Sequence, residues 1–305
     1  MKFFHKLFLT AAAATLLLSS EVLAAGKTAV PDERAAFDAA CQVMSQVQSQ
    51  HVTGTLAINS PLIGTTLQLD SRMQAAPSHL MAGTVTANTA DPLGRDHQSA
   101  VPFYLERSGQ AIDTYIERDG KWEHHTQDIS KLQSAANAPK IQALLNKAQI
   151  FGPVTLVRED KTATTLKAKL NSRGLAEAMS SLGQWLPKKP ASYATLIQVL
   201  KAADTIDTLV TIDKATRHIT AASCDLTPAC RAAAKILLQQ PNLSPLQQLV
   251  IQQLAGNASI RLDLHYSDFD QPMNLTIPDE VRGRTAADTP AAPAADDTTG
   301  TEEAL

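Results

Sequence analysis

The sequence predicts an α+β protein with an antiparallel sheet of about ten or eleven strands and helices lying across one face of it. Three observations support this prediction. Many segments alternate apolar and polar residues, the pattern of strands with one buried face. Short turn sequences join neighbouring strands, as in hairpins. Helical segments lie between groups of strands and not after every strand, so the βαβ order of a parallel sheet is missing.

The first group of strands is expected between residues 52 and 124, as a meander of short hairpins. Its clearest turn is Asp119-Gly120, a two-residue hairpin sequence. Residues 91–99 are expected to form a polar loop. A second group of strands is expected within 154–170 and 206–224, where the same alternation returns.

The last patterned stretch, Ala258–Val281, is predicted to form a strand, a corner and a second strand. Residues 260–266 alternate apolar and polar side chains, and the alternation returns at 273–277 after a corner at 268–272. We expect this pair of strands to form the closing edge of the sheet.

The helices are predicted from apolar residues at three- and four-residue spacing. The first spans residues 32–48, and two more lie within 175–203, separated by prolines. Another helix is expected to start with Thr227 as its cap. The next is expected to be capped by Ser244 and to stop at Gly256.

The N-terminal sequence predicts export. Lys2 and Lys6 precede an apolar run at 7–18, and the small residues at 22–24 are typical of a cleavage site. The run is shorter than the roughly 20 apolar residues of a membrane-spanning helix. We therefore expect residues 1–24 to be a secretory signal peptide and the mature protein to carry no transmembrane anchor.

The rest of the chain is expected to contain one domain and a tail. Residues 25–281 are predicted to form a single domain, and 282–305, rich in Ala, Thr, Pro and acidic residues, a disordered acidic tail. The net charge of the chain is -3, and the acids of the tail leave the domain nearly neutral. A neutral domain argues against nucleic-acid binding, which usually needs a basic face.

No sequence motif predicts catalysis or a cofactor: a nucleophile elbow, a Gly-rich phosphate loop and a His-Glu-x-x-His sequence are all missing. His124 and His125 are adjacent on a predicted strand, so they point to opposite faces and do not favour a metal site. His265 and Asp263 are interpreted as a solvated pair. We expect a noncatalytic protein without cofactor or metal.

The three cysteines suit an oxidising compartment. Cys224 and Cys230 form a candidate disulfide that would join the end of a strand to the start of a helix. Cys41 has apolar helical neighbours and is interpreted as a buried free thiol.

Several features occur together in the order of a known family. They are a signal peptide and leading amphipathic helix, a meander with the turn Asp-Gly-Lys-Trp at 119–122, lid-like helices, an Ile-Asp-Lys turn at 212–214 and the final sequence YSDFDQPMNLTIPDEV. In these features the chain resembles the bacterial lipoprotein-carrier superfamily, the Lol-type and LppX-like proteins, and most of all its uncharacterised secreted members. The resemblance implies a strongly curved antiparallel sheet, an open half-barrel, with its concave face covered by helices. It also implies an apolar cavity for acyl chains between sheet and helices.

From this resemblance we expect an exported bacterial protein, periplasmic or extracellular, that binds a lipid, an acyl chain or a lipid-modified protein. Apolar residues of the strands, and a tryptophan at the end of a helix, are expected to line the cavity: Leu56, Leu67, Met81, Ile112, Ile116, Trp185, Val210, Leu262 and Leu264. The alternative is a protein-interaction or envelope-sensor module of the same fold with a closed core, which recruits an envelope protein partner. The apolar pattern fits both, because a filled core and a hollow one need the same residues.

Overall fold

The computed structural model describes residues 32–60, 64–76, 79–90, 95–133, 144, 150–183, 193–203, 205–239 and 243–283. The predicted signal peptide, Trp185 and the tail from residue 284 onward lie outside these residues. The chain forms two compact units, Met1–Leu275 and Thr276–Leu305. All described strands and helices belong to the first unit. In the second unit, the Val281 backbone N–H donates to the Pro278 carbonyl at 3.0 Å and forms a turn.

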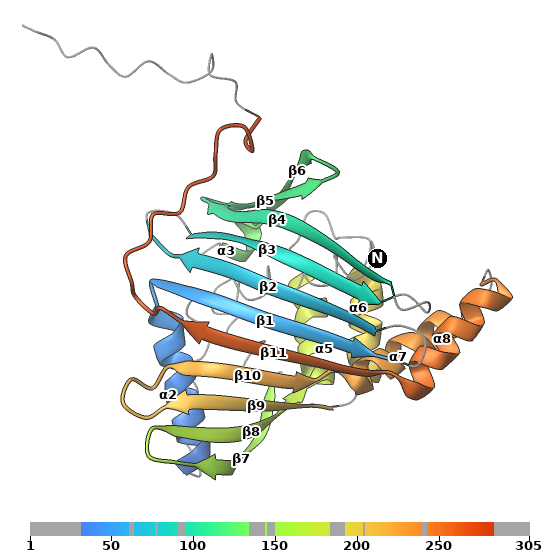
Figure 1. Ribbon diagram of the computed structural model, residues 1–305. Helices are drawn as coiled ribbons and strands as arrows, with labels where there is room; N and C mark the ends of the chain where they lie inside the picture. Colours follow the sequence, from blue (N-terminus) through green and yellow to red (C-terminus); the bar gives the residue numbers. More distant parts are fainter. Residues whose placement is uncertain are drawn as a thin grey trace, which may run out of the picture. The chain divides into compact units, whose positions relative to one another are not determined.

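Eleven strands form one antiparallel sheet with the order β6-β5-β4-β3-β2-β1-β11-β10-β9-β8-β7 (Figure 1). The sheet is open, because β6 and β7 stand at its two edges. This confirms the predicted fold class, an α+β half-barrel of ten or eleven antiparallel strands with helices. The strands are β1 (Ser49–Asn59), β2 (Gly64–Gln74), β3 (His79–Ala90), β4 (Asp96–Ser108), β5 (Ala111–Arg118), β6 (Lys121–Asp128), β7 (Phe151–Glu159), β8 (Ala163–Asn171), β9 (Thr205–Asp213), β10 (Ile219–Asp225) and β11 (Ser259–Ser267).

The described helices are α2 (Asp32–Gln46), α3 (Ser130–Gln133), α5 (Ser172–Leu182), α6 (Tyr193–Ala202), α7 (Thr227–Leu238) and α8 (Pro245–Asn257). Figure 1 shows α2, α5 and α6 on the far side of the sheet. The helices α5, α6, α7 and α8 pack against one another in series. Asn171 is the N-cap of α5, because its side-chain oxygen accepts the Gly174 backbone N–H at 3.0 Å.

The strand register gives the sheet two chemically different faces, because paired residues point to the same side. One row across eight strands is apolar: Leu166, Val210, Ala222, Leu264, Gly54, Leu69, Val85 and Val101. The neighbouring row points to the other side and is mostly polar: Thr165, Thr211, Ala221, His265, Thr53, Asp70, Thr84 and Pro102. Phe37 and Ala40 of α2 pack in one cluster with Leu166 and Val210, so helices cover the apolar face.

The last strand lies in the middle of the sheet and not at its edge. β11 pairs with β1 on one side and with β10 on the other, so the expectation of a closing edge is wrong. The reason is its composition. Apolar side chains at Ile260, Leu262 and Leu264 fill a central position, whereas the highly polar β6 can be placed at an edge.

The predicted second strand at 273–277 is also wrong, because residues 271–278 form no ladder with any strand. Pro272 and Pro278 lack the N–H that a ladder requires. Instead the Gln74 side chain holds the chain from both sides: its oxygen accepts the Leu275 N–H at 2.9 Å, and its amide donates to the Leu275 carbonyl at 3.1 Å. We call residues Asp268–Leu275 the strap.

Three smaller expectations are wrong. β4 begins at Asp96, inside the expected polar loop, because residues 96–99 extend the ladder with β3 although their side chains are exposed. Thr227 does not cap α7, since its hydroxyl oxygen accepts the Ile260 backbone N–H at 3.0 Å. α8 continues through Gly256 to Asn257.

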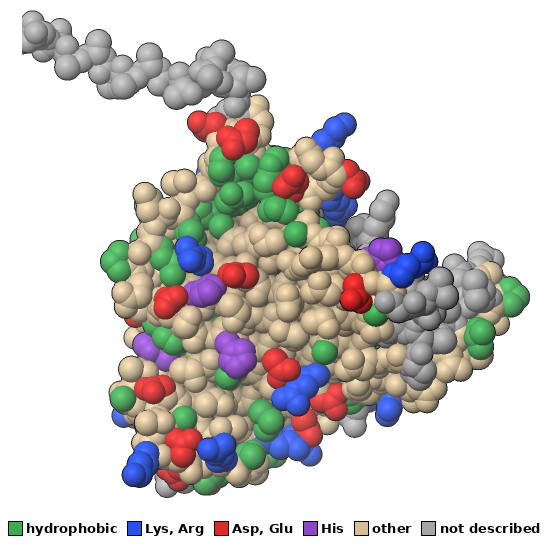
Figure 2. All heavy atoms as spheres, viewed as in Figure 1, with side chains coloured by type: hydrophobic (Ala, Val, Ile, Leu, Met, Phe, Trp, Pro, Cys, Tyr) green, Lys and Arg blue, Asp and Glu red, His purple; other side chains and the backbone are tan. Residues whose placement is uncertain are grey.

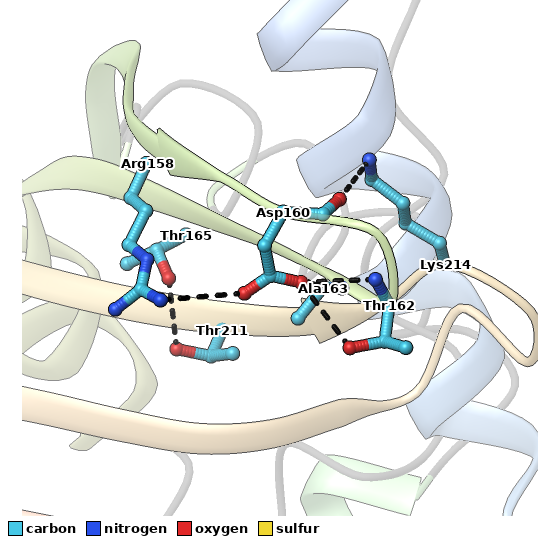
Figure 3. A network of polar contacts seen from close by, with 7 residues as sticks. All are labelled: Arg158, Asp160, Thr162, Ala163, Thr165, Thr211 and Lys214. Carbon is cyan, nitrogen blue, oxygen red and sulfur yellow. Dashed lines mark hydrogen bonds and ion pairs between the residues drawn. The ribbon is translucent and has the colours of Figure 1, made fainter.

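The turns at one end of the second half of the sheet are joined by a polar network (Figure 3). The Asp160 carboxylate accepts the backbone N–H groups of Thr162 at 2.9 Å and Ala163 at 2.8 Å, and these bonds lower the pKa of Asp160. Lys214, from the β9–β10 turn, donates to the Asp160 carbonyl at 2.6 Å. Asp160 therefore organises the β7–β8 turn, and its carboxylate is a structural group.

The two edge strands differ in how they interrupt further pairing. β6 carries Lys121, Glu123 and two histidines. β7 contains Pro153, and its register with β8 shifts on either side of the segment 154–156. Both features weaken the regular row of backbone groups that another strand would need.

Gly83 provides a test of how tightly the centre of the sheet is packed. A Cβ atom at Gly83 would lie 2.4 Å from the Asp70 carbonyl oxygen, whereas a Cβ at Gly64, in the adjacent strand, meets nothing within 4 Å. We expect Gly83→Ala to lower the free energy of unfolding by about 1–3 kcal/mol, the usual cost of overpacking. Gly64→Ala is the matched control and should change it by less than about 0.5 kcal/mol. Urea denaturation measures both, and equal effects would contradict the packing described here.

Candidate functional site

The apolar face holds three clusters of buried side chains. The first, the strand cluster, consists of Val52, Leu69, Met81, Val85, Phe103, Leu105 and Ile116. These residues come from β1 to β5, and among the described residues no helix contributes to this cluster. The second cluster joins α2 to β7, β8 and β9. The third lies over β1, β2, β3 and β11 and is contacted by Leu226 and Cys230.

The structure brings the expected cavity residues onto one face of the sheet but divides them among clusters. Six are buried: Leu56, Leu67, Met81, Ile112, Ile116 and Val210. Leu262 and Leu264 are half-buried on the same face, and Trp185 lies outside the described residues. Met81 and Ile116 belong to the strand cluster, while Leu56 and Leu67 belong to the third. A ligand role for these residues stays a prediction.

The apolar face also contains a polar group that the sequence pattern did not reveal. Gln50 of β1 pairs with Met73, which packs against the strand cluster. The Gln50 side-chain oxygen is buried and accepts no hydrogen bond from the described part of the chain. Leaving such a group without a partner costs about 1–3 kcal/mol. A hydrogen-bond donor brought by a ligand would remove this cost.

The cysteines lie on the helix-covered side. Burial, reinforced by the nearby Asp38 carboxylate, raises the pKa of Cys41 to about 12. Cys224 pairs with Leu262 in the sheet, and Cys230 packs against the cluster that includes Leu262. All three are free thiols in the structure, and the disulfide between Cys224 and Cys230 stays a prediction.

The histidines of β6 are held separately, as their spacing predicted. His124 Nε2 lies 2.9 Å from the Asp113 carboxylate and its ring stacks on Tyr115, while His125 lies 3.7 Å from Glu123. No metal-binding group of His, Cys, Asp or Glu occurs among the described residues.

The expected pair of Asp263 and His265 is replaced by another contact. The Asp263 carboxylate is paired with Arg261 at 2.9 Å. His265 instead lines a groove on the polar face of the sheet.

This groove, which we call the polar groove, has a volume of about 840 Å³. Its side chains come mainly from the outward positions of β1, β2, β3 and β4, with His265 from β11 and Leu275 from the strap. Figure 2 shows this face as a broad surface of uncharged polar side chains and backbone. The residues that line it are Thr53, Gly54, Thr55, Gln68, Leu69, Asp70, Ser71, Arg72, Ala82, Gly83, Thr84, Thr86, Pro102, Tyr104, His265 and Leu275.

The polar groove was not predicted from the sequence, because the pattern of each strand shows only that one face is solvated. Neighbouring strands had to be placed in register before Thr53, Asp70 and Thr84 could be recognised as neighbours. The strap that closes one side begins at Asp268, whose carboxylate faces His51 at 3.6 Å.

The fold and these two faces define a protein built on an open antiparallel half-barrel, with a helix-covered apolar face and a hollowed polar face. No protein-family model matches the chain, and no curated protein matches it in sequence. Among the described residues, no helix has the length and apolar character needed to cross a membrane.

Solved structures resemble the chain over most of its length. The match to the lipoprotein LppX of Mycobacterium tuberculosis covers 81% of this chain and 99% of the LppX chain, at 15% identity and a TM-score of 0.37. LprF of Mycobacterium bovis matches 81% with 97% of its own, at 10% identity and a TM-score of 0.37. A DUF1329 family protein of Desulfovibrio piger matches 80% with 95% of its own, at 9% identity and a TM-score of 0.28. The expected resemblance to LppX-like proteins is confirmed, and at these values it carries no functional information.

The cysteines provide a test of compartment and pairing. If the predicted disulfide between Cys224 and Cys230 forms, protein purified from an oxidising compartment and unfolded without reductant should take up one alkyl group, on Cys41. In the native protein Cys41 should react far more slowly than a free thiol, since its raised pKa keeps it protonated. Mass spectrometry after iodoacetamide treatment measures both. Three alkyl groups without reduction would contradict the disulfide.

Proposed function

We propose that this protein is a noncatalytic, exported bacterial envelope protein that binds a lipid, an acyl chain or a lipid-modified protein on the apolar face of its sheet. The ligand would lie between the strands and the helices that cover them. The observation that carries the proposal is the buried Gln50 oxygen beside the strand cluster. An acyl chain with a hydroxyl-bearing head would match both, because the chain suits the apolar surface and the hydroxyl supplies the missing donor.

The extent of the apolar face supports this proposal. The apolar row continues without a charged residue from Leu166 in β8 to Val101 in β4. Neighbouring strands are spaced by about 4.8 Å, so this row is more than 30 Å long. A surface of this length accommodates a whole acyl chain. Helix α2 packs on the β8 and β9 part of this row and would separate that part of a bound acyl chain from water.

The proposal is tested by lipid extraction and by binding of a defined probe. Mass spectrometry of gently purified protein should detect a co-purifying lipid, and 1-monopalmitoylglycerol should bind. Gln50→Leu should weaken the binding of monopalmitoylglycerol by up to about tenfold, which corresponds to the loss of one hydrogen bond. The same substitution should raise the stability of the free protein, because it removes an unsatisfied oxygen. Gln68→Leu, on the polar face of β2, is the matched control and should change neither quantity. A protein that carries no lipid and binds no acyl probe would sink the proposal.

A second function is favoured by the packing of the expected cavity residues. Leu67 is 2% exposed and Val210 is 4% exposed, as in a closed core. On this alternative the protein is an interaction or sensor module, and the acidic tail at 282–305 recruits an envelope protein. Removal of residues 282–305 should then abolish cross-linking to that partner in intact cells. If the truncated protein instead keeps both its cross-links and its lipid, the alternative is rejected.

A further inference from the structure

The polar groove lies on the side of the sheet opposite to the apolar clusters, so it is a second, independent candidate site. Its lining side chains alternate with the buried ones along the same strands: Thr53 and Thr55 flank Gly54, and Thr84 and Thr86 flank Val85. The volume of about 840 Å³ is within the usual range of small-molecule sites.

The floor of the groove is an array of groups that both donate and accept hydrogen bonds. Thr53, Thr55, Thr84 and Thr86 contribute hydroxyls from β1 and β3, and Gln68 contributes an amide from the strand between them. Neighbouring strands lie about 4.8 Å apart, and successive side chains on one face lie about 7 Å apart. A compound with many hydroxyls can make several bonds to such an array, because each hydroxyl group donates and accepts in turn.

The charged groups at the groove include one arginine without an ion-pair partner among the described residues. The Asp70 carboxylate lies 2.7 Å from His51 Nε2, and the other nitrogen of His51 faces Asp268 at 3.6 Å. Arg72 lines the same groove, and no ion pair or hydrogen bond of its side chain occurs within the described part of the chain. A guanidinium in this position favours a ligand with a carboxylate, sulfate or phosphate, which it binds through two parallel hydrogen bonds.

One wall of the groove is apolar and aromatic. Tyr104 lines it, together with Pro102, and the Tyr104 ring lies 5.5 Å from the ring of the half-buried Trp122. Aromatic rings pack against the C–H faces of sugar rings as they do against other apolar surfaces, while the phenol hydroxyl stays available for a hydrogen bond.

Another part of the groove lining is fixed in place before any ligand arrives. Leu275 of the strap is held by both hydrogen bonds of the Gln74 side chain. Farther along, the Asp270 carboxylate accepts the Gln48 N–H at 2.7 Å, and the Asp270 N–H donates to the Ser49 carbonyl at 2.8 Å. A wall fixed in this way lowers the entropy cost of binding.

We propose that the polar groove binds an anionic saccharide, with hydroxyls on the threonine array, the acidic group on Arg72 and one sugar ring against Tyr104. A free oligosaccharide and the head of a glycolipid share this chemistry. Nucleic acid is disfavoured, because the Asp70 carboxylate lines the same groove and Arg72 is the only arginine or lysine among its described lining residues.

The test uses the full chain and two matched pairs of probes. The first pair is oligogalacturonate and its methyl ester, and the second is a phosphorylated mannan oligosaccharide and its dephosphorylated form. Calorimetry should detect binding of at least one anionic probe, and the neutral counterpart of that probe should bind at least about tenfold more weakly. Arg72→Gln should remove the difference in affinity between the two probes of the pair. Thr84→Val should weaken the binding of both probes. A glycolipid with the same head that binds more tightly than the free sugar identifies the source as a lipid head.

The controls separate this site from the apolar face and from general damage. Arg173→Gln on α5 and Thr155→Val on β7 remove the same groups at exposed positions outside the groove and should leave binding unchanged. Gln50→Leu should also leave saccharide binding unchanged, so failure of the lipid proposal and failure of this one are distinguishable. The proposal would be overturned if no probe binds at millimolar concentration or if charged and neutral members bind with equal affinity. It would also be overturned if the preference for the charged member survives Arg72→Gln. Circular dichroism confirms that each variant folds.

Discussion

The pairing of the first strand with the last is the interaction on which the rest of the structure depends. β1 to β6 grow outward in sequence on one side of the sheet, and β7 to β11 grow inward on the other, so the two halves meet only along β1 and β11. This seam runs from the pair His51 and Ser267 to the pair Asn59 and Ser259. Residues two hundred or more positions apart must therefore meet before the sheet is continuous, and such long-range pairing is slow to form.

The seam also aligns the two faces. Because side chains alternate along every strand, a shift of one residue between β1 and β11 would move one half of the apolar row to the polar side. In the observed register Leu56 stands between Leu67 and Leu262, and Thr53 stands between Asp70 and His265. One set of backbone hydrogen bonds thus positions both candidate sites, one for an apolar ligand and one for a charged sugar.

Much of the fold follows from local sequence, and what does not depends on long-range placement. Alternation and turn residues predicted nearly all the strands, since period two and the Asp-Gly turn act over a few residues. The same local signals cannot reveal which strands become neighbours, which is why β11 was expected at an edge. At 273–277 the alternation was genuine, but two prolines and the Gln74 side chain replaced the expected ladder.

The candidate sites were predictable to different degrees. The apolar face was foreseen from Leu56, Leu67 and their neighbours, because burial of one strand face is a property of each strand. The role of Gln50 was not foreseen, because a single glutamine beside apolar residues has no distinctive spacing. Predicting the polar groove requires the register of four strands and the position of the strap. Neither can be predicted from the sequence of a single segment.

The two edges of the sheet bear on how the protein behaves at high concentration. Leu156 and Val157 of β7 are 46% and 53% exposed, a combination that in a regular edge strand would invite fibre growth. The register shifts that surround them, and Pro153 before them, break the strand into pieces too short to template another chain. At the far edge the charged and polar side chains of β6 disfavour pairing with a second copy. An open sheet of eleven strands can therefore stay dispersed at high concentration without closing into a barrel.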